Sequence, residues 1–251
     1  MNRLTEVVKH LLIINVILFI ATQIYGDQMY QWLALWFPEN ENFQIWQVVT
    51  HMFMHGGIAH IGFNMFGLYM FGGPVESYLG KNKFLFLYFS AGLGAVLFQL
   101  GGYYYNYMPI HTGLMDLGLT NDQVLQMITS NQTIEGLTQI QFEAVKEAFP
   151  VYQGTYFSSM VGASGCLMGV LAAFGVMNPN AELMLIFLPI PIKAKYFIPG
   201  IIILDVISAV TGQSFFSPSN TAYLAHVGGA IVGFIIMWYW KKNSFNDKRW
   251  D

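Results

Sequence analysis

Long apolar stretches divide the chain from end to end, and they restrict its fold more than any other feature. Six of them reach, or nearly reach, the roughly 20 residues that a helix needs to cross the core of a bilayer. They cover residues 8–25, 58–78, 84–102, 157–177, 186–210 and 222–240. Only 10% of all residues are charged, whereas soluble domains carry about 25%. The sequence therefore predicts an all-α, polytopic membrane protein with a bundle of six transmembrane helices.

The basic residues predict how the chain is oriented in the membrane. If the N-terminus faces the cytoplasm and the connections alternate, ten of the 11 Lys and Arg residues fall on the cytoplasmic side, and only Lys146 falls outside. Basic residues are enriched in this way in cytoplasmic loops. We therefore expect both termini in the cytoplasm. The net charge of −3 provides no basic surface for nucleic acid.

The connection between the third and fourth stretches, residues 103–156, is long and polar. Loops of this length without structure are unusual, so we expect an ordered extramembrane insert. Thr120 with Gln123 resembles a capping box that opens a short helix. The pattern of residues 139–149 predicts a second helix, which Pro150 would end.

Strongly polar side chains gather near the outer ends of three predicted spans. His60 and Asn64 lie in the second span, Ser164 near the start of the fourth and His226 near the start of the sixth. Because all three spans run inward, the predicted topology places these side chains at a similar depth below the outer surface. Such residues inside a membrane are costly and usually functional.

Small residues should let the helices of Ser164 and His226 approach each other closely. Gly229 and Gly233 follow His226 by three and seven residues, and the fourth span has Gly165 and Gly169 four residues apart. Small residues four apart favour close helix packing in lipid. A serine and a histidine on two such faces can come within hydrogen-bond distance, as nucleophilic catalysis requires. Taken alone, each residue also fits ordinary packing between helices.

His60 and Asn64 are four residues apart and therefore share one helix face. Both side chains can donate a hydrogen bond, and neither brings a permanent charge, which suits the stabilisation of a developing oxyanion. A hydrogen bond between helices explains the pair equally well.

Metal chemistry is the alternative for the histidines. His51 and His55 have the spacing of the zinc-binding helix in H-E-x-x-H proteases, but Met52 stands where the general-base glutamate would be. No third ligand lies nearby in the sequence. Asp205, a lone carboxylate in the fifth span, would serve either a metal or a neighbouring helix. We expect no metal.

In combination, these residues resemble the rhomboid family of intramembrane serine proteases. Residues 162–165 (GASG) resemble its GxSG nucleophile motif, and residues 225–229 (AHVGG) resemble its AHxxG motif. Residues 55–64 match the spacing H-x-x-x-x-H-x-x-x-N of its second span, and residues 72–76 (GGPVE), followed by Gly80, resemble the end of that span. The resemblance runs through all six predicted spans and implies a single rhomboid-type membrane domain over residues 1–251.

The resemblance implies peptide-bond hydrolysis in or near the transmembrane segments of single-span membrane proteins. Ser164 would be the nucleophile and His226 the base of a catalytic dyad, without a cofactor. The oxyanion hole would consist of His60, Asn64 and the backbone N–H groups of Ser164 and Ala163. It further implies a water-filled cavity, capped by the loop between the fifth and sixth spans, in a protein of the bacterial inner (cytoplasmic) membrane.

Three further positions concern how the site is supported. His55 would hold structure and water near the site. Gln47 follows Trp46 where the family usually has an arginine, which predicts weaker anchoring of the first loop. Met168 replaces an aromatic residue that usually stacks on the catalytic imidazole, although a thioether can still contact the edge of that ring.

We expect no carboxylate beside His226. The sixth span contains none, and Asp205 should lie in the middle or outer half of the fifth span. The sequence therefore predicts a dyad whose imidazole is oriented by packing and by Met168, and substantial activity in Asp205→Asn.

Two other classes of protein compete with a protease. An inactive rhomboid-like protein that binds membrane clients would be marked by loss of the serine or the histidine, and both are present. A channel or transporter would line its path with buried histidines, but it would not need a glycine-flanked serine paired with one of them.

Overall fold

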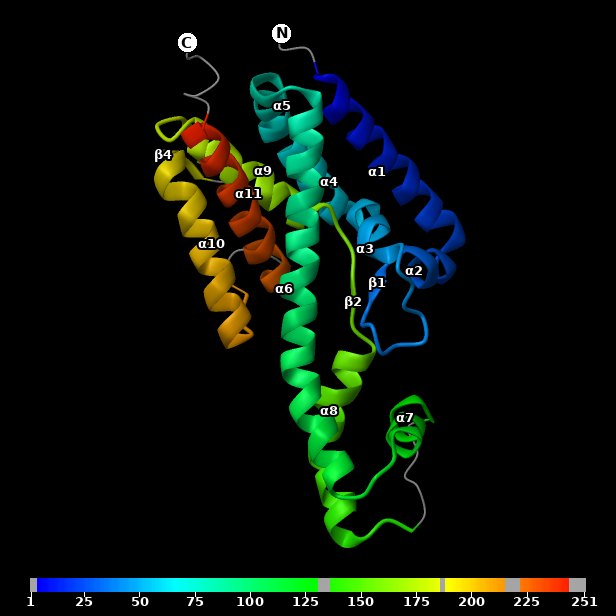
Figure 1. Cartoon of the computed structure of the whole chain (residues 1–251). Coiled ribbons are helices and arrows are strands. Elements are labelled where there is room, and N and C mark those ends of the chain that lie inside the picture. The colour runs from blue at the N-terminus through cyan, green and yellow to red at the C-terminus, as the bar shows by residue number, and fades with distance from the viewer. Residues whose placement is uncertain (1–3, 131–135, 186–187, 215–221, 244–251) are drawn as a thin grey trace. The chain divides into compact units, whose positions relative to one another are not determined.

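The computed structural model describes residues 4–130, 136–185, 188–214 and 222–243. Over these ranges the chain is mainly helical, as Figure 1 shows. It forms two compact units. Unit 1 comprises Met1–Leu35, Ile45–Gln99 and Met160–Asp251, and unit 2 comprises Trp36–Gln44 and Leu100–Ser159.

Unit 1 contains most of the helices. They are α1 (Glu6–Tyr25), α2 (Asp27–Leu33), α3 (Gln47–Thr50), α4 (Ile58–Gly67), α5 (Gly73–Leu79), the first half of α6 (Lys81–Asp116), α9 (Ser164–Met177), α10 (Ala194–Thr211) and α11 (Tyr223–Asn243). A 3-10 turn, His51–Phe53, follows α3, and a π-helical segment, Leu68–Gly72, joins α4 to α5. Two short strands, β1 (Leu35–Trp36) and β2 (Ser159–Met160), pair where the chain passes between the units.

Within the described residues, four helices are long and apolar enough to cross a membrane: α1, α6, α10 and α11. Their surfaces fit a lipid environment, since large apolar side chains such as Ile24 and Val210 are 70% and 82% exposed. The second predicted span is present as α4, the π-helical segment and α5, and the fourth as α9, which has only 14 residues. Six membrane crossings stay a prediction.

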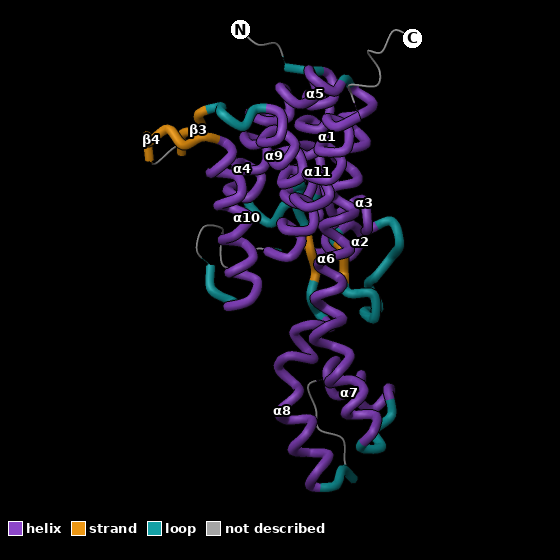
Figure 2. The backbone as a smooth tube through the Cα atoms, turned by 60° about the vertical axis from the view of Figure 1, so that its left-hand side comes forward, coloured by secondary structure: helices purple, strands orange, loops and turns teal. Residues whose placement is uncertain are grey.

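Two predicted spans begin later in the structure than in the sequence. Residues 157–163 are not a helix, because β2 and a turn at Gly162 precede α9. In the predicted 186–210 span, residues 188–193 form strand β4 (Leu188–Lys193), which pairs antiparallel with β3 (Glu182–Leu185); both strands are visible in Figure 2. Alternating prolines at 189 and 191 explain this, because proline breaks helical hydrogen bonding.

The predicted small-residue faces of α9 and α11 are confirmed. The two helices pack so closely that a Cβ atom on Gly229 would collide with the carbonyl oxygen of Gly165, and one on Gly233 would collide with the backbone of Gly169. The backbone of Ala225 lies at the same contact, 3.7 Å from the Cβ position of Gly165. The first turns of both helices therefore lie side by side.

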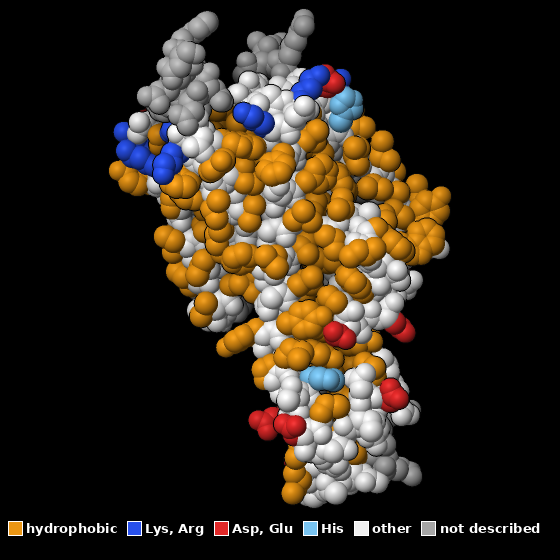
Figure 3. Space-filling model, viewed as in Figure 1, with side chains coloured by type: hydrophobic (Ala, Val, Ile, Leu, Met, Phe, Trp, Pro, Cys, Tyr) orange, Lys and Arg blue, Asp and Glu red, His pale blue; other side chains and the backbone are white. Residues whose placement is uncertain are grey.

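Basic residues gather at the opposite end of unit 1. Lys81 at the start of α6 pairs with Glu6 at the start of α1, and Lys241 near the end of α11 donates to the carbonyl of Val176 near the end of α9, at 2.8 Å. Figure 3 shows Lys and Arg side chains at the upper end of this unit, above a wide apolar surface. The first contact joins the starts of α1 and α6, and the second joins the ends of α9 and α11.

Glu76 ties the second span to the first helix at this end. Its carboxylate accepts the backbone N–H groups of Val7 and Val8 at 3.0 and 2.9 Å. The first N–H groups of a helix have no partner within the helix, so a carboxylate there both satisfies donors and complements the helix dipole.

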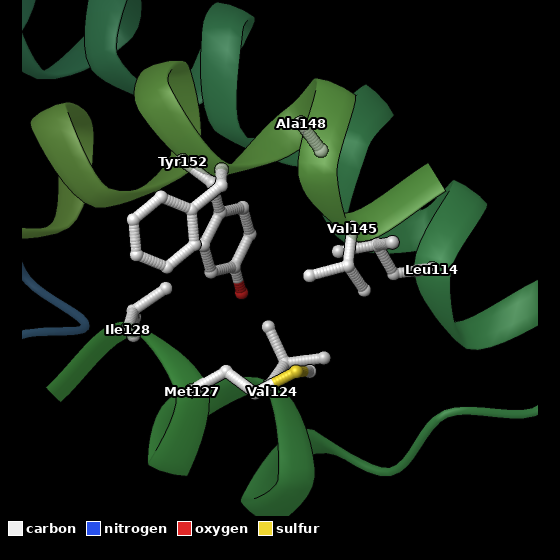
Figure 4. A pocket seen from close by; sticks show the side chains of 8 residues that line it. Leu114, Val124, Met127, Ile128, Val145, Ala148 and Tyr152 are labelled. Atoms are coloured by element: carbon white, nitrogen blue, oxygen red, sulfur yellow. The ribbon is translucent and has the colours of Figure 1, made fainter. Parts of the chain in front are cut away.

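Unit 2 contains the second half of α6 with α7 (Asn121–Ser130) and α8 (Gln139–Tyr156). Its core is a cluster of buried residues that includes Phe37, Tyr107, Leu114 and Tyr152. Side chains from the three helices line a small apolar pocket in this core, as Figure 4 shows. The predicted third span ends at residue 102, but α6 continues to Asp116. The first part of the predicted insert, residues 103–116, is therefore helical.

The helix ends of unit 2 test two sequence predictions. The capping box of Thr120 and Gln123 is confirmed, since each side chain bonds the other's backbone N–H, at 3.3 and 2.8 Å. The predicted stop at Pro150 is wrong, because α8 continues to Tyr156. Burial of Tyr152 and Tyr156 in the core of unit 2 outweighs the hydrogen bond that proline removes. The extramembrane location of residues 103–156 stays a prediction.

Candidate active site

Ser164 is the first residue of α9, and Ala163 is its N-cap. The first bond within the helix runs from the Leu167 N–H to the Ala163 carbonyl, at 2.9 Å. The N–H of Ser164 is therefore not used within the helix, and it lies at the end of α9 where the helix dipole is positive. Ser164 is half-buried.

Gly162 joins three parts of the site. Its φ of +128° lies in a region that residues with a side chain rarely adopt. Its N–H donates to the carbonyl of His51 at 2.9 Å. A Cβ atom at this position would lie 2.8 Å from His60 Nε2 and 3.6 Å from Ser164 Oγ. The backbone at Gly162 therefore lies between the His60 imidazole and the Ser164 hydroxyl.

His60 and Asn64 both present hydrogen-bond donors on α4. The N–H of Gly56 donates to His60 Nδ1 at 3.3 Å, so a neutral imidazole carries its proton on Nε2, the atom nearest Gly162. Asn64 is 5% exposed, and its Nδ2 has no hydrogen-bond partner among the described residues. Two neutral donors thus lie on the face predicted from the sequence.

His226 lies in the first turn of α11 and is 8% exposed. The carbonyl oxygen of its neighbour Ala225 lies 3.7 Å from the Cβ position of Gly165, the residue after Ser164. The structure thus places the first turns of α9 and α11 side by side, with His60 of α4 beside the turn that precedes Ser164.

A carboxylate does lie beside His226, so the expectation that none would is wrong. Asp205 Oδ2 is 2.9 Å from His226 Nδ1, and Asp205 is 1% exposed. Asp205 lies in the second half of α10 (Ala194–Thr211), within the part of the fifth span predicted from the sequence. There α10 packs against α11, and the two side chains meet.

His55 and His51 lie behind the site, outside the membrane-spanning helices. The ring of His55 contacts that of His60 edge-on, with centroids 4.9 Å apart, and His51 Nδ1 bonds the carbonyl oxygen of Gln47 at 2.7 Å. Burial lowers the pKa of each to about 4, and in His55 the neighbouring His60 adds to this shift. Both rings are therefore neutral at neutral pH. The supporting role of His55 stays a prediction.

Gln47 is fully buried at the start of α3. Its Nε2 donates to the carbonyls of Gln31 and Trp32 at 3.0 and 3.4 Å, and Trp46 Nε1 donates to the Trp32 carbonyl at 2.9 Å. The amide thus attaches α3 to α2. Weaker anchoring than an arginine would give stays a prediction.

Met168 is buried in the apolar core of unit 1, one turn after Ser164. Its contact with the imidazole stays a prediction. In the described part of the chain, no three His, Cys, Asp or Glu side chains converge where they could hold a metal ion. The loop expected to cap the site includes residues 215–221, which lie outside the described residues.

These features define an integral, multi-pass membrane protein in which His60 lies beside the turn that precedes Ser164 and His226 lies on the helix packed against α9. The Rhomboid domain model matches residues 42–120 and 122–243. The chain therefore belongs to the rhomboid family, and it has the polytopic helical membrane fold that this domain implies.

Proposed function

We propose that the protein is an intramembrane serine protease in which Ser164 attacks the substrate carbonyl and His226 accepts the serine proton. The observation that carries this proposal is the convergence of His60 and Ser164 on Gly162, with His226 on the helix packed against α9. A serine hydroxyl is a weak nucleophile until a base removes its proton. His226 Nε2 is the candidate base, since Nδ1 faces Asp205.

The oxyanion of the tetrahedral intermediate would be bound by His60, Asn64 and the backbone N–H groups of Ser164 and Ala163. Two observations support this assignment. Asn64 Nδ2 is a buried donor without a partner among the described residues, and His60 Nε2 lies beside the Ser164 turn. Donors that are already in place when charge develops are what such catalysis needs.

The membrane arrangement of the proposed enzyme follows the sequence prediction. The chain crosses the bacterial inner membrane six times, with both termini in the cytoplasm and the site near the outer surface. Its substrates are single-span membrane proteins, cleaved in or near their transmembrane segments. The separation of the basic residues from Ser164 along α9 and α11 supports this orientation.

The competing function is an inactive rhomboid-like protein that binds membrane clients. Purified protein in proteoliposomes, given a fluorogenic single-span substrate, separates the two. The protease reading expects cleavage by the wild type, none by Ser164→Ala, and retained cleavage by Cys166→Ala, a buried neighbour on the same helix. A fluorophosphonate probe should label the wild type and not Ser164→Ala. Cleavage by Ser164→Ala, or loss of cleavage on adding a metal chelator, would contradict the proposal.

A further inference from the structure

We propose that Asp205 is a positioning residue for His226, so that the site works as an Asp205–His226–Ser164 triad rather than as a dyad. This inference rests on the proposed function. It assigns Asp205 a role in catalysis through the histidine, without contact to the substrate.

The geometry between the two side chains carries the inference. Asp205 Oδ2 lies 2.9 Å from His226 Nδ1, and the side chains of Asp205 and His226 are only 2% and 11% exposed. An ionised carboxylate can only accept a hydrogen bond, so Nδ1 must carry the proton. The lone pair then resides on Nε2, where a base for Ser164 needs it. The contact thus selects both the tautomer and the orientation of the ring.

A purely structural role explains the carboxylate less well. A buried carboxylate loses several kcal/mol of hydration, and a pair with a histidine repays this only when the geometry is good. A serine suffices to tie helices together at much lower cost. The carboxylate is most favourable at the moment when the histidine becomes an imidazolium, which occurs during proton transfer. Among the described residues, the titratable neighbours of His226 are Asp205 on α10 and His60 on α4.

The first test is Asp205→Asn, which keeps the shape of the side chain and removes its charge. We expect kcat for a single-span substrate to fall by about 10²–10⁴ with KM changed less than about twofold, since the loss concerns the transition state. Ser208→Ala is the matched control, because Ser208 is buried one turn further along α10 and its hydroxyl donates to the Leu204 carbonyl of its own helix. It should cleave like the wild type. A folded Asp205→Asn with wild-type kcat would overturn the inference.

A second measurement reports on Asp205 without the Asp205→Asn variant. In wild-type protein labelled with ¹⁵N-histidine, the His226 ring at neutral pH should show a protonated Nδ1 and an unprotonated Nε2. His226→Ala assigns the resonance by its disappearance. A proton on Nε2 instead would overturn the inference even if Asp205→Asn does not fold.

Failure of this inference is distinct from failure of the proposed function. If Ser164→Ala cleaves, the protease itself is wrong. If Ser164→Ala is inactive while Asp205→Asn keeps the kcat of the wild type, the protease stands and His226 is oriented by packing alone.

Discussion

Gly162→Ala should lower both activity and stability, through two effects whose magnitude follows from the structure. The φ of +128° is unfavourable for alanine, and holding a side chain in such a region costs about 1–3 kcal/mol. The new Cβ would also lie 2.8 Å from His60 Nε2 and 2.9 Å from Cε1, so the imidazole must move. Displacing one oxyanion donor typically lowers kcat by about 10²–10³. The melting temperature should also fall, by about 2–4 °C for each kcal/mol lost.

The assay is cleavage of a fluorogenic single-span substrate in proteoliposomes, together with a thermal melt in detergent. Gly62→Ala is the matched control, because Gly62 lies in α4 beside the same histidine, is exposed, and a Cβ there meets no atom within 4 Å. That variant should keep full activity and be as stable as the wild type or slightly more so, since alanine favours helix. A Gly162→Ala protein that matches Gly62→Ala in both measurements would refute the reasoning.

Three further predictions concern the donors, the first loop and the topology. His60→Ala and Asn64→Ala should each lower kcat by about 10²–10³ with a smaller change in KM, as loss of an oxyanion donor does; wild-type kcat in both would remove them from the hole. Gln47→Ala removes the amide donor of the Gln31 carbonyl, while the Trp32 carbonyl keeps Trp46 Nε1, and it should cost about 1–3 kcal/mol of stability, read from the melting temperature, whereas an unchanged melt would mean that the amide does not anchor α3. In a cysteine-free background, an impermeant thiol reagent should label Ser130→Cys but not Asn243→Cys in intact cells, and the reverse pattern would invert the topology.

The face that carries the site could be predicted from the sequence because helical spacing is a local property. His60 and Asn64 are four residues apart, so any helix there aligns them. The close contact of α9 with α11 followed from glycines at regular spacing, since only small residues allow backbones to meet. The predicted topology puts the three helix ends at one depth, and that depth stays a prediction.

The partner of His226 could not be predicted because it depends on which side of α10 faces α11. That rotation is set by the packing of the two helices, and hydropathy does not reveal it. The length of α8 has a similar cause. Proline is a local signal to stop, whereas the burial of Tyr152 and Tyr156 is a property of the folded unit.

The placement of unfavourable groups favours an enzyme over an inactive binding protein. A buried donor without a partner costs about 1–3 kcal/mol, and Asn64 Nδ2 is such a donor in the described part of the chain. A positive φ at Gly162 and a buried carboxylate at Asp205 lie in the same unit, each close to Ser164 or His226. Local rules are usually broken at functional sites. In the proposed mechanism each departure would have a use in acyl transfer: Asn64 would bind the oxyanion, Gly162 would keep space for His60, and Asp205 would hold the base.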